Sequence, residues 1–211
     1  MAEVTAQMVK DLRAMTGAGP LDCKKALEAN GGDIDKAIDY LRDRGLAKAA
    51  KKLSGGRTMN EGVIQTYQHF NQRLGVLVEV NCETDFVANS EPFQEFSRSI
   101  GLHIANMNPE YVRREDVPDA VIQAERDLQM RILKEDPKNA NKPDEILEKI
   151  IEGRMGKFFE EIVLLEQEFL LDDTKKVHEA LSELVAKVGE SCEVRRFARF
   201  ALGEDDSNGE E

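Results

Sequence analysis

The chain has 211 residues, of which 41% are hydrophobic and 33% are charged, and its formal net charge at pH 7 is −12. This length and composition are typical of a globular protein with one main domain and a small accessory one. An acidic chain repels the phosphate backbone of nucleic acids, so direct nucleic-acid binding is not expected.

Nothing in the sequence indicates a membrane or secretory protein. No run approaches the roughly 18 apolar residues of a membrane-spanning helix, and the N-terminal sequence lacks the basic and apolar regions of a signal peptide. We therefore expect a cytoplasmic protein that does not bind a membrane. The 3 cysteines and 3 histidines are widely scattered, so neither a disulfide framework nor a metal site is expected.

The sequence contains none of the motifs that hold phosphates, dinucleotides or a catalytic serine. The remaining candidates for acid–base chemistry are the pairs Glu115-Asp116 and Asp172-Asp173 and the lone His103. Both acidic pairs are expected at helix starts, where carboxylates cap the helix and offset its dipole. His103 lies beside the apolar face of a predicted helix, which favours a packed or surface residue over a base. No cofactor and no enzyme active site are predicted.

Charge is distributed unevenly along the chain. Residues 1–57 hold 11 Lys and Arg against 8 Asp and Glu, a net charge of +3, which leaves −15 for residues 58–211. We predict an N-terminal three-helix domain with its linker over residues 1–54, a core over residues 55–202, and a disordered acidic tail over residues 203–211. A protein partner with a complementary surface is the expected ligand.

Residues 4–45 are predicted to form three short helices in a small bundle. Thr5 can cap the first helix and Asp33 the third, and the glycines of TGAG and NGG allow tight reversals between helices. The third helix is expected to close at Gly45, and the following LAKAAKK and SGG are typical of a semi-rigid connector with a flexible end. Cys23, Ala26 and Leu27 are predicted on the inner face of the second helix. The apolar residues at helical spacing in the first and third helices are Met8, Val9, Leu12, Met15, Ile34, Ala37, Ile38 and Leu41.

The core is predicted to be α+β, with a small antiparallel sheet, packed helices and a projecting helical hairpin. The strand-like stretches Glu61–His69 and Arg73–Val80 flank a turn at Asn71-Gln72, which indicates a β-hairpin. Glu193–Leu202 also has the period of a strand, with Val194, Ala198, Phe200 and Leu202 predicted on one face.

Helical spacing of apolar residues marks the helices of the core. One helix is expected to open at Ser90 and Pro92. Two charged, amphipathic segments at about residues 116–159 are predicted to pair as an antiparallel helical hairpin. Asp172 or Asp173 is expected to cap the last helix.

The stretch GVLVEVNCETDFVANSEPF, residues 75–93, joins a strand to a helix. Its valines alternate with Leu77 and Glu79, as in a half-buried strand. The segment Thr84-Asp85-Phe86-Val87 then follows in a predicted loop, where a rigid scaffold can present side chains. Residue types leave two interpretations open: either Phe86 is buried and Asp85 caps a turn, or Phe86 is an exposed anchor of an interface.

Four segments of the sequence carry a resemblance to a known family. RAMTGAGPLDCKKAL, residues 13–27, and GVLVEVNCETDFVA, residues 75–88, closely resemble the elongation factor Ts family, the guanine nucleotide exchange factors of elongation factor Tu. EGRMGKF, residues 152–158, and VRRFARF, residues 194–200, are similar to the same family. The resemblance implies an N-terminal bundle similar to ubiquitin-associated domains, followed by an α+β core that carries a helical hairpin.

The resemblance also implies a translation elongation factor without a cofactor of its own, which binds elongation factor Tu in its GDP-bound and nucleotide-free forms. In the family, the Thr-Asp-Phe-Val segment inserts its aromatic ring between helices of the partner's G domain and disturbs the nucleotide-bound Mg²⁺, so that GDP leaves for GTP. Phe86 would be the wedge, and Asp85 would hold the loop or contact the partner. The implied site residues are Thr84, Asp85, Phe86 and Val87, with further partner contacts at Lys10, Arg13, Leu21, Lys24 and His69.

The number of copies of the core motif bears on the assembly. Longer members of the family carry two copies of the core half, whereas this chain has one GVLV strand and one TDFV segment. The resemblance therefore implies a symmetric homodimer, with Cys192 or the strand Glu193–Leu202 as candidates for the contact. The alternative is an adaptor of the ubiquitin-associated type, whose N-terminal bundle binds a peptide and whose core is a passive scaffold.

Overall fold

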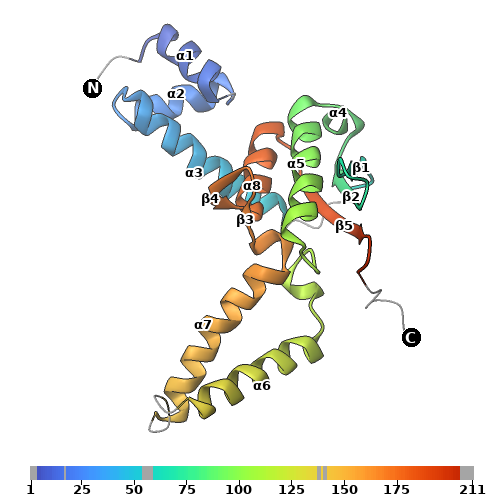
Figure 1. The fold of residues 1–211 in the computed structure, drawn as a ribbon. Coiled ribbons are helices and arrows are strands. Elements are labelled where there is room, and N and C mark those ends of the chain that lie inside the picture. Colours follow the sequence, from blue (N-terminus) through green and yellow to red (C-terminus); the bar gives the residue numbers. More distant parts are fainter. Residues whose placement is uncertain (1–3, 17, 54–58, 137–138, 140–141, 205–211) are drawn as a thin grey trace. The chain divides into compact units, whose positions relative to one another are not determined.

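The computed structural model describes residues 4–16, 18–53, 59–136, 139 and 142–204. Within them the chain is α+β, as predicted, with a three-stranded sheet of order β1-β2-β5 and a two-stranded sheet of β3 and β4 (Figure 1). The helices are α1 (Ala6–Thr16), α2 (Pro20–Ala29), α3 (Ile34–Leu53), α4 (Asp85–Ala88), α5 (Glu91–Met107), α6 (Asp119–Glu135), α7 (Asp144–Ile162) and α8 (Val177–Val188). The strands are β1 (Glu61–Gln68), β2 (Leu74–Cys82), β3 (Glu168–Phe169), β4 (Asp172–Lys176) and β5 (Cys192–Ala201), and two 3₁₀ turns are η1 (Arg114–Asp116) and η3 (Leu164–Glu166).

The chain divides into two compact units that do not follow the order of the sequence. One unit consists of Met1–Ile64, Glu79–Ser97 and Glu179–Val194, and the other of Gln65–Val78, Arg98–His178 and Arg195–Glu211. The domain boundary at residue 54 stays a prediction. The SGG segment and the tail at residues 205–211 lie outside the described residues.

The three N-terminal helices form the predicted bundle. Thr5 and Asp33 are the caps, since Thr5 Oγ1 accepts from the Met8 amide at 3.3 Å and Asp33 Oδ1 accepts from the Lys36 amide at 3.1 Å. The reversal between α2 and α3 uses Gly31 and Gly32, with φ of +64° and +84°. The fully buried side chains of the bundle are Leu12, Cys23, Ala26, Leu27 and Ala37.

The prediction that the third helix closes at Gly45 is wrong, because α3 continues to Leu53. Alanine and lysine are strong helix formers, and the LAKAAKK segment outweighs the roughly 1 kcal/mol that one internal glycine costs. The glycine has a packing role instead. A Cβ at Gly45 would lie 3.2 Å from the Cβ of Ala186, so only a glycine allows this approach of α3 to α8 without a shift.

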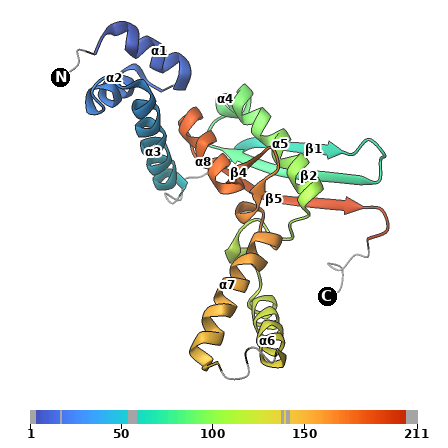
Figure 2. The same cartoon turned by 60° about the vertical axis from the view of Figure 1, so that its left-hand side comes forward.

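The predicted β-hairpin and its alternation are confirmed. Figure 2 shows β2 running antiparallel to β1 and β5. Val76, Val78 and Val80 are buried, whereas Leu77 is 46% exposed on the other face of the strand. The strand runs two residues beyond its predicted end, to Cys82. In the second unit, α5 approaches β1 closely, since a Cβ at Gly101 would lie 3.5 Å from the Cβ of Tyr67.

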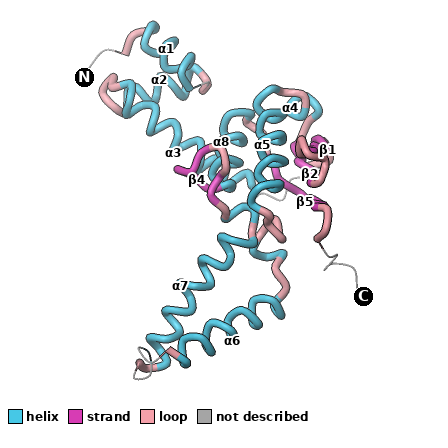
Figure 3. The backbone as a smooth tube through the Cα atoms, in the orientation of Figure 1, coloured by secondary structure: helices cyan, strands magenta, loops and turns pink. Residues whose placement is uncertain are grey.

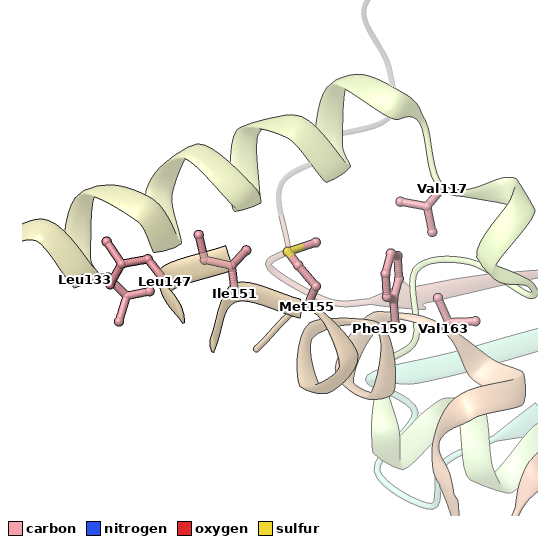
Figure 4. Packing of buried hydrophobic residues seen from close by; sticks show 7 residues of the cluster. All are labelled: Val117, Leu133, Leu147, Ile151, Met155, Phe159 and Val163. Carbon is pink, nitrogen blue, oxygen red and sulfur yellow. The ribbon is translucent and has the colours of Figure 1, made fainter. Parts of the chain in front are cut away.

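The helical hairpin of α6 and α7 is also confirmed. Its helices begin after Pro118 and Pro143, which occupy the N-cap positions. Figure 4 shows the buried side chains as a row along the two helices: Val117, Leu133, Leu147, Ile151, Met155, Phe159 and Val163. At the base of the hairpin, the Arg114 guanidinium lies 4.2 Å from the centre of the Phe159 ring and donates from Nε to Glu166 at 2.6 Å.

One predicted helix start is wrong. Asp172 and Asp173 do not cap a helix but lie in β4, which Figure 3 draws as a strand. β4 pairs antiparallel with β3, and α8 begins later, at Val177. The Asp172 carboxylate accepts from the hydroxyl and the amide of Thr174, at 2.6 and 3.2 Å. Hydrogen bonds from Thr174 and Lys175 hold the pKa of Asp172 below its ordinary value. The other acidic pair does cap, because Asp116 accepts from the Arg113 amide at the start of η1.

The apolar face predicted for β5 is buried at one end only. Val194 is fully buried, but Phe200 and Leu202 are 66% and 67% exposed. β5 is an edge strand of the sheet, and the alternation of apolar residues continues past the part of the strand that is covered. Exposed apolar side chains on an edge strand mark a surface on which a partner can pack.

Candidate functional site: an exposed phenylalanine on a capped helical turn

The segment after β2 is one helical turn, α4, where the sequence predicted a loop. Thr84 is its N-cap, with extended backbone (φ −133°, ψ 155°), and its Oγ1 accepts from the Val87 amide at 3.4 Å. The capping residue is therefore Thr84, and the sequence-based alternative in which Asp85 caps a turn is wrong. A threonine hydroxyl at this position satisfies one of the amides that a helix start leaves unpaired.

The turn separates its side chains into buried and exposed ones. Val87 and Ala88 are 3% and 5% exposed and hold α4 to the core, whereas Phe86 is 80% exposed. Successive residues of a helix point about 100° apart, so the turn that buries Val87 directs Phe86 outward. The interpretation of Phe86 as a core residue is wrong, and the exposed ring is available to a partner.

The carbonyl groups at the other end of α4 are also satisfied. Asp85 O accepts from the Asn89 amide and side chain at 3.0 and 2.8 Å, and Ala88 O accepts from Gln94 Nε2 at 2.6 Å. The helix predicted to open at Ser90 and Pro92 is α5, which begins at Glu91, and the Ser90 hydroxyl donates to Val87 O at 2.7 Å. A four-residue helix is unstable by itself, so these hydrogen bonds are needed to hold α4 in one conformation.

A buried thiol lies beneath the turn. Cys82 Sγ is 3.2 Å from Thr84 O. Burial raises the pKa of the Cys82 thiol to about 11, so at neutral pH the thiol keeps its proton and donates to this carbonyl. Among the described residues, Asp85 is exposed and its carboxylate has no hydrogen bond or ion pair, which leaves it free to accept from a partner beside Phe86.

The predicted contacts on the N-terminal bundle are all on its surface. Lys10 and Arg13 are exposed on α1, and Leu21 and Lys24 are exposed on α2, with Leu21 at 64%. Lys24 Nζ lies 3.8 Å from Glu28, an exposed pair that contributes little to stability. These four side chains present two cations on one helix and a cation with an apolar group on the next.

His69 belongs to the other unit and lies in the turn between β1 and β2. Its Nδ1 is 2.9 Å from the hydroxyl of Tyr67, and its ring centre lies 4.4 Å from that of Phe70. Phe70 is 88% exposed. Sequence reasoning missed Phe70, although an aromatic residue beside the polar Asn71-Gln72 turn was the signal that could have found it.

His103 is a packed residue, as predicted. Its Nδ1 accepts from the Leu170 amide at 3.2 Å, so Nε2 carries the proton and donates to Gln167 Oε1 at 2.9 Å. Burial lowers the pKa of His103. Across the described ranges, no group of three or more His, Cys, Asp or Glu side chains is placed to hold a metal ion, and no helix is long and apolar enough to cross a membrane.

Comparisons with known proteins show the family of this chain. The family model described as elongation factor TS matches residues 13–205. The chain is 52% identical over 201 residues to elongation factor Ts of Thermosipho melanesiensis, covering 95% of this chain and 100% of that protein. It is 53% identical to elongation factor Ts of Carboxydothermus hydrogenoformans, covering 95% of this chain and 90% of that protein, and 50% identical to that of Thermotoga petrophila, covering 96% and 98%. The chain therefore belongs to the elongation factor Ts family.

Proposed function

We propose that this protein is a translation elongation factor that binds elongation factor Tu–GDP and promotes the release of GDP and its exchange for GTP. The observation that carries the proposal is the 80% exposed ring of Phe86 on a turn whose backbone is held at both ends. Membership of the elongation factor Ts family supports the choice of partner.

In the proposed mechanism the turn acts as a wedge. The ring of Phe86 enters between helices of the partner's G domain, and the Asp85 carboxylate accepts a hydrogen bond beside it. This insertion displaces the Mg²⁺ that the partner holds with its nucleotide, so GDP is bound less tightly. Thr84 and Val87 support the wedge by capping and anchoring the turn.

The coupling between the two ligands of the partner is reciprocal. If this protein weakens GDP binding by a given factor, nucleotide weakens the binding of this protein by the same factor. GTP can therefore bind after GDP has left and release the factor for another cycle. In this mechanism the protein forms no covalent bond with its partner and holds no cofactor, so it acts as an exchange factor and not as an enzyme. The proposed location is the cytoplasm.

Contacts away from the wedge would set the affinity. The exposed cations Lys10, Arg13 and Lys24 would steer the approach of the partner. The exposed apolar side chain of Leu21 could be buried in the contact. His69 and its exposed neighbour Phe70 would supply a second contact region.

A homodimer is the proposed assembly. In the second unit, Leu77 on β2 and Phe200 on β5 are 46% and 66% exposed on strands that are neighbours in the sheet, and Leu202, directly after β5, is 67% exposed. Exposed apolar side chains on neighbouring strands favour a contact with another copy of the chain. The domain division at residue 54 is likewise retained as a proposal.

Release of fluorescent GDP from elongation factor Tu tests the proposal. Excess protein should accelerate release many-fold over the intrinsic rate, and excess GTP should dissociate the resulting complex. A release rate that is the same with and without the protein contradicts the exchange function. The adaptor alternative predicts that result, together with binding to a peptide through the N-terminal bundle alone.

A further inference from the structure

Two short segments exchange hydrogen bonds next to the proposed wedge. Glu190 lies between α8 and β5, and its Oε2 accepts from the Thr84 amide at 3.1 Å. The Thr84 hydroxyl lies 2.9 and 3.1 Å from the two oxygens of the same carboxylate. In return, the Ser191 amide donates to Glu83 Oε1 at 2.8 Å. Each segment therefore binds the backbone of the other through a glutamate side chain.

The positions of the protons connect this clamp to α4. The Thr84 hydroxyl has one proton, and the Glu190 carboxylate can only accept. The hydroxyl must therefore donate to Glu190 and use a lone pair to accept from the Val87 amide at 3.4 Å. The result is a chain of hydrogen bonds from the Val87 amide through Thr84 to Glu190, in which the charged end polarises and strengthens the next bond.

The local backbone explains how Glu190 reaches this position. Gly189 ends α8 with a φ of +78°, a conformation that favours glycine. Its amide still donates to Val185 O at 3.0 Å. The chain therefore reverses immediately before Glu190, which places the carboxylate at the end of a packed helix whose Leu184 and Val185 are buried.

We infer that Glu190 is a positioning residue that fixes the orientation of α4 and so presents Phe86 to the partner, with Glu83 as the reciprocal half of the clamp. This inference rests on the proposed exchange function. A turn that is already oriented loses less conformational entropy when it docks. If the clamp is lost, only a fraction of the molecules presents the ring correctly, and the apparent affinity falls in proportion to that fraction.

Two substitutions of Glu190 test the role of its geometry. Glu190→Gln offers one acceptor oxygen in place of two, so its NH₂ group must face either the Thr84 amide or the Thr84 hydroxyl. Glu190→Asp keeps the charge but is one methylene too short. We expect each variant to need about tenfold more protein for half-maximal GDP release, as the loss of a charge-assisted hydrogen bond would cause. The rate at saturation should stay near the parent value, and the free energy of unfolding should fall by no more than the loss of this bond accounts for.

The matched control is Glu145→Gln, which removes the same charge from an exposed position in the first turn of α7 and should leave exchange unchanged. Retained activity in Glu190→Asp with reduced activity in Glu190→Gln would show simple charge attraction to the partner and overturn the inference. Unchanged activity in both Glu190 variants would also overturn it.

A double variant separates this inference from the proposed function. In the Phe86→Ala background, Glu190→Gln should have less than about a twofold further effect, because the residue acts through the ring. The same tenfold loss in both backgrounds would mean that Glu190 acts elsewhere, which overturns the inference alone. If Phe86→Ala by itself leaves exchange unchanged, the wedge is refuted and the role of Glu190 falls with it.

Amide hydrogen exchange in the free protein gives a readout that does not need the partner. Glu190→Gln should speed exchange of the Thr84 and Val87 amides by about tenfold, while the amide of the buried Ile100 in α5 keeps its protection. Unchanged exchange at Thr84 and Val87 would show that Glu190 does not order the turn, whatever the activity of the variant.

Discussion

Truncation of the exposed ring, Phe86→Ala, is the most informative perturbation of the proposed wedge. In the free protein the ring is 80% exposed, so its removal should change the free energy of unfolding by less than about 0.5 kcal/mol. Full burial of a phenylalanine is worth about 1.5–3 kcal/mol. Burying the exposed four-fifths in the partner would then contribute about 1.2–2.4 kcal/mol, or about an 8- to 60-fold change in binding.

Stopped-flow release of fluorescent GDP from elongation factor Tu, measured over a range of protein concentrations, gives this change directly. The matched control is Leu171→Ala, which truncates a 58% exposed apolar side chain between β3 and β4 and should leave exchange unchanged. If Phe86→Ala accelerates GDP release as well as the parent protein does, while both remain folded, the wedge mechanism is refuted.

Three further predictions concern stability, pH and assembly. Gly62→Ala should destabilise the protein by about 1–3 kcal/mol, because φ at this position is +150° and the added Cβ would lie 2.2 Å from Val80 O. Gly156→Ala has no atom within 4 Å of the added Cβ, so it should stabilise α7 by about 0.5–1 kcal/mol. Urea unfolding measures both changes. Since burial lowers the pKa of His103 in the folded protein below its ordinary value of about 6.5, the unfolded state binds more protons and the free energy of unfolding should fall from pH 7 to pH 5. A His103→Gln variant that keeps this slope would refute His103 as its cause. Phe200→Glu should shift the mass measured by light scattering from dimer toward monomer, and an unchanged mass would exclude this part of β5 from the contact.

Patterns with a strict local period were predicted correctly. The alternation around Val76 and Val78, the caps at Thr5 and Asp33 and the pairing of α6 with α7 follow from short-range rules of burial and hydrogen bonding. Errors occurred where two local signals competed. Asp172 has the chemistry of a helix cap, but its carboxylate binds Thr174 within β4 instead.

For the candidate site, the sequence by itself determined which residues to examine: the TDFV segment, its place after a half-buried strand, and the family it resembles. It could not decide whether Phe86 is buried, because residue type alone does not tell which side of a turn faces the core. Tertiary structure decided this by burying Val87, which directs the neighbouring ring outward. It also brought Glu190 to Thr84 from 106 positions away in the chain, a contact that no local pattern encodes because it depends on where α8 ends.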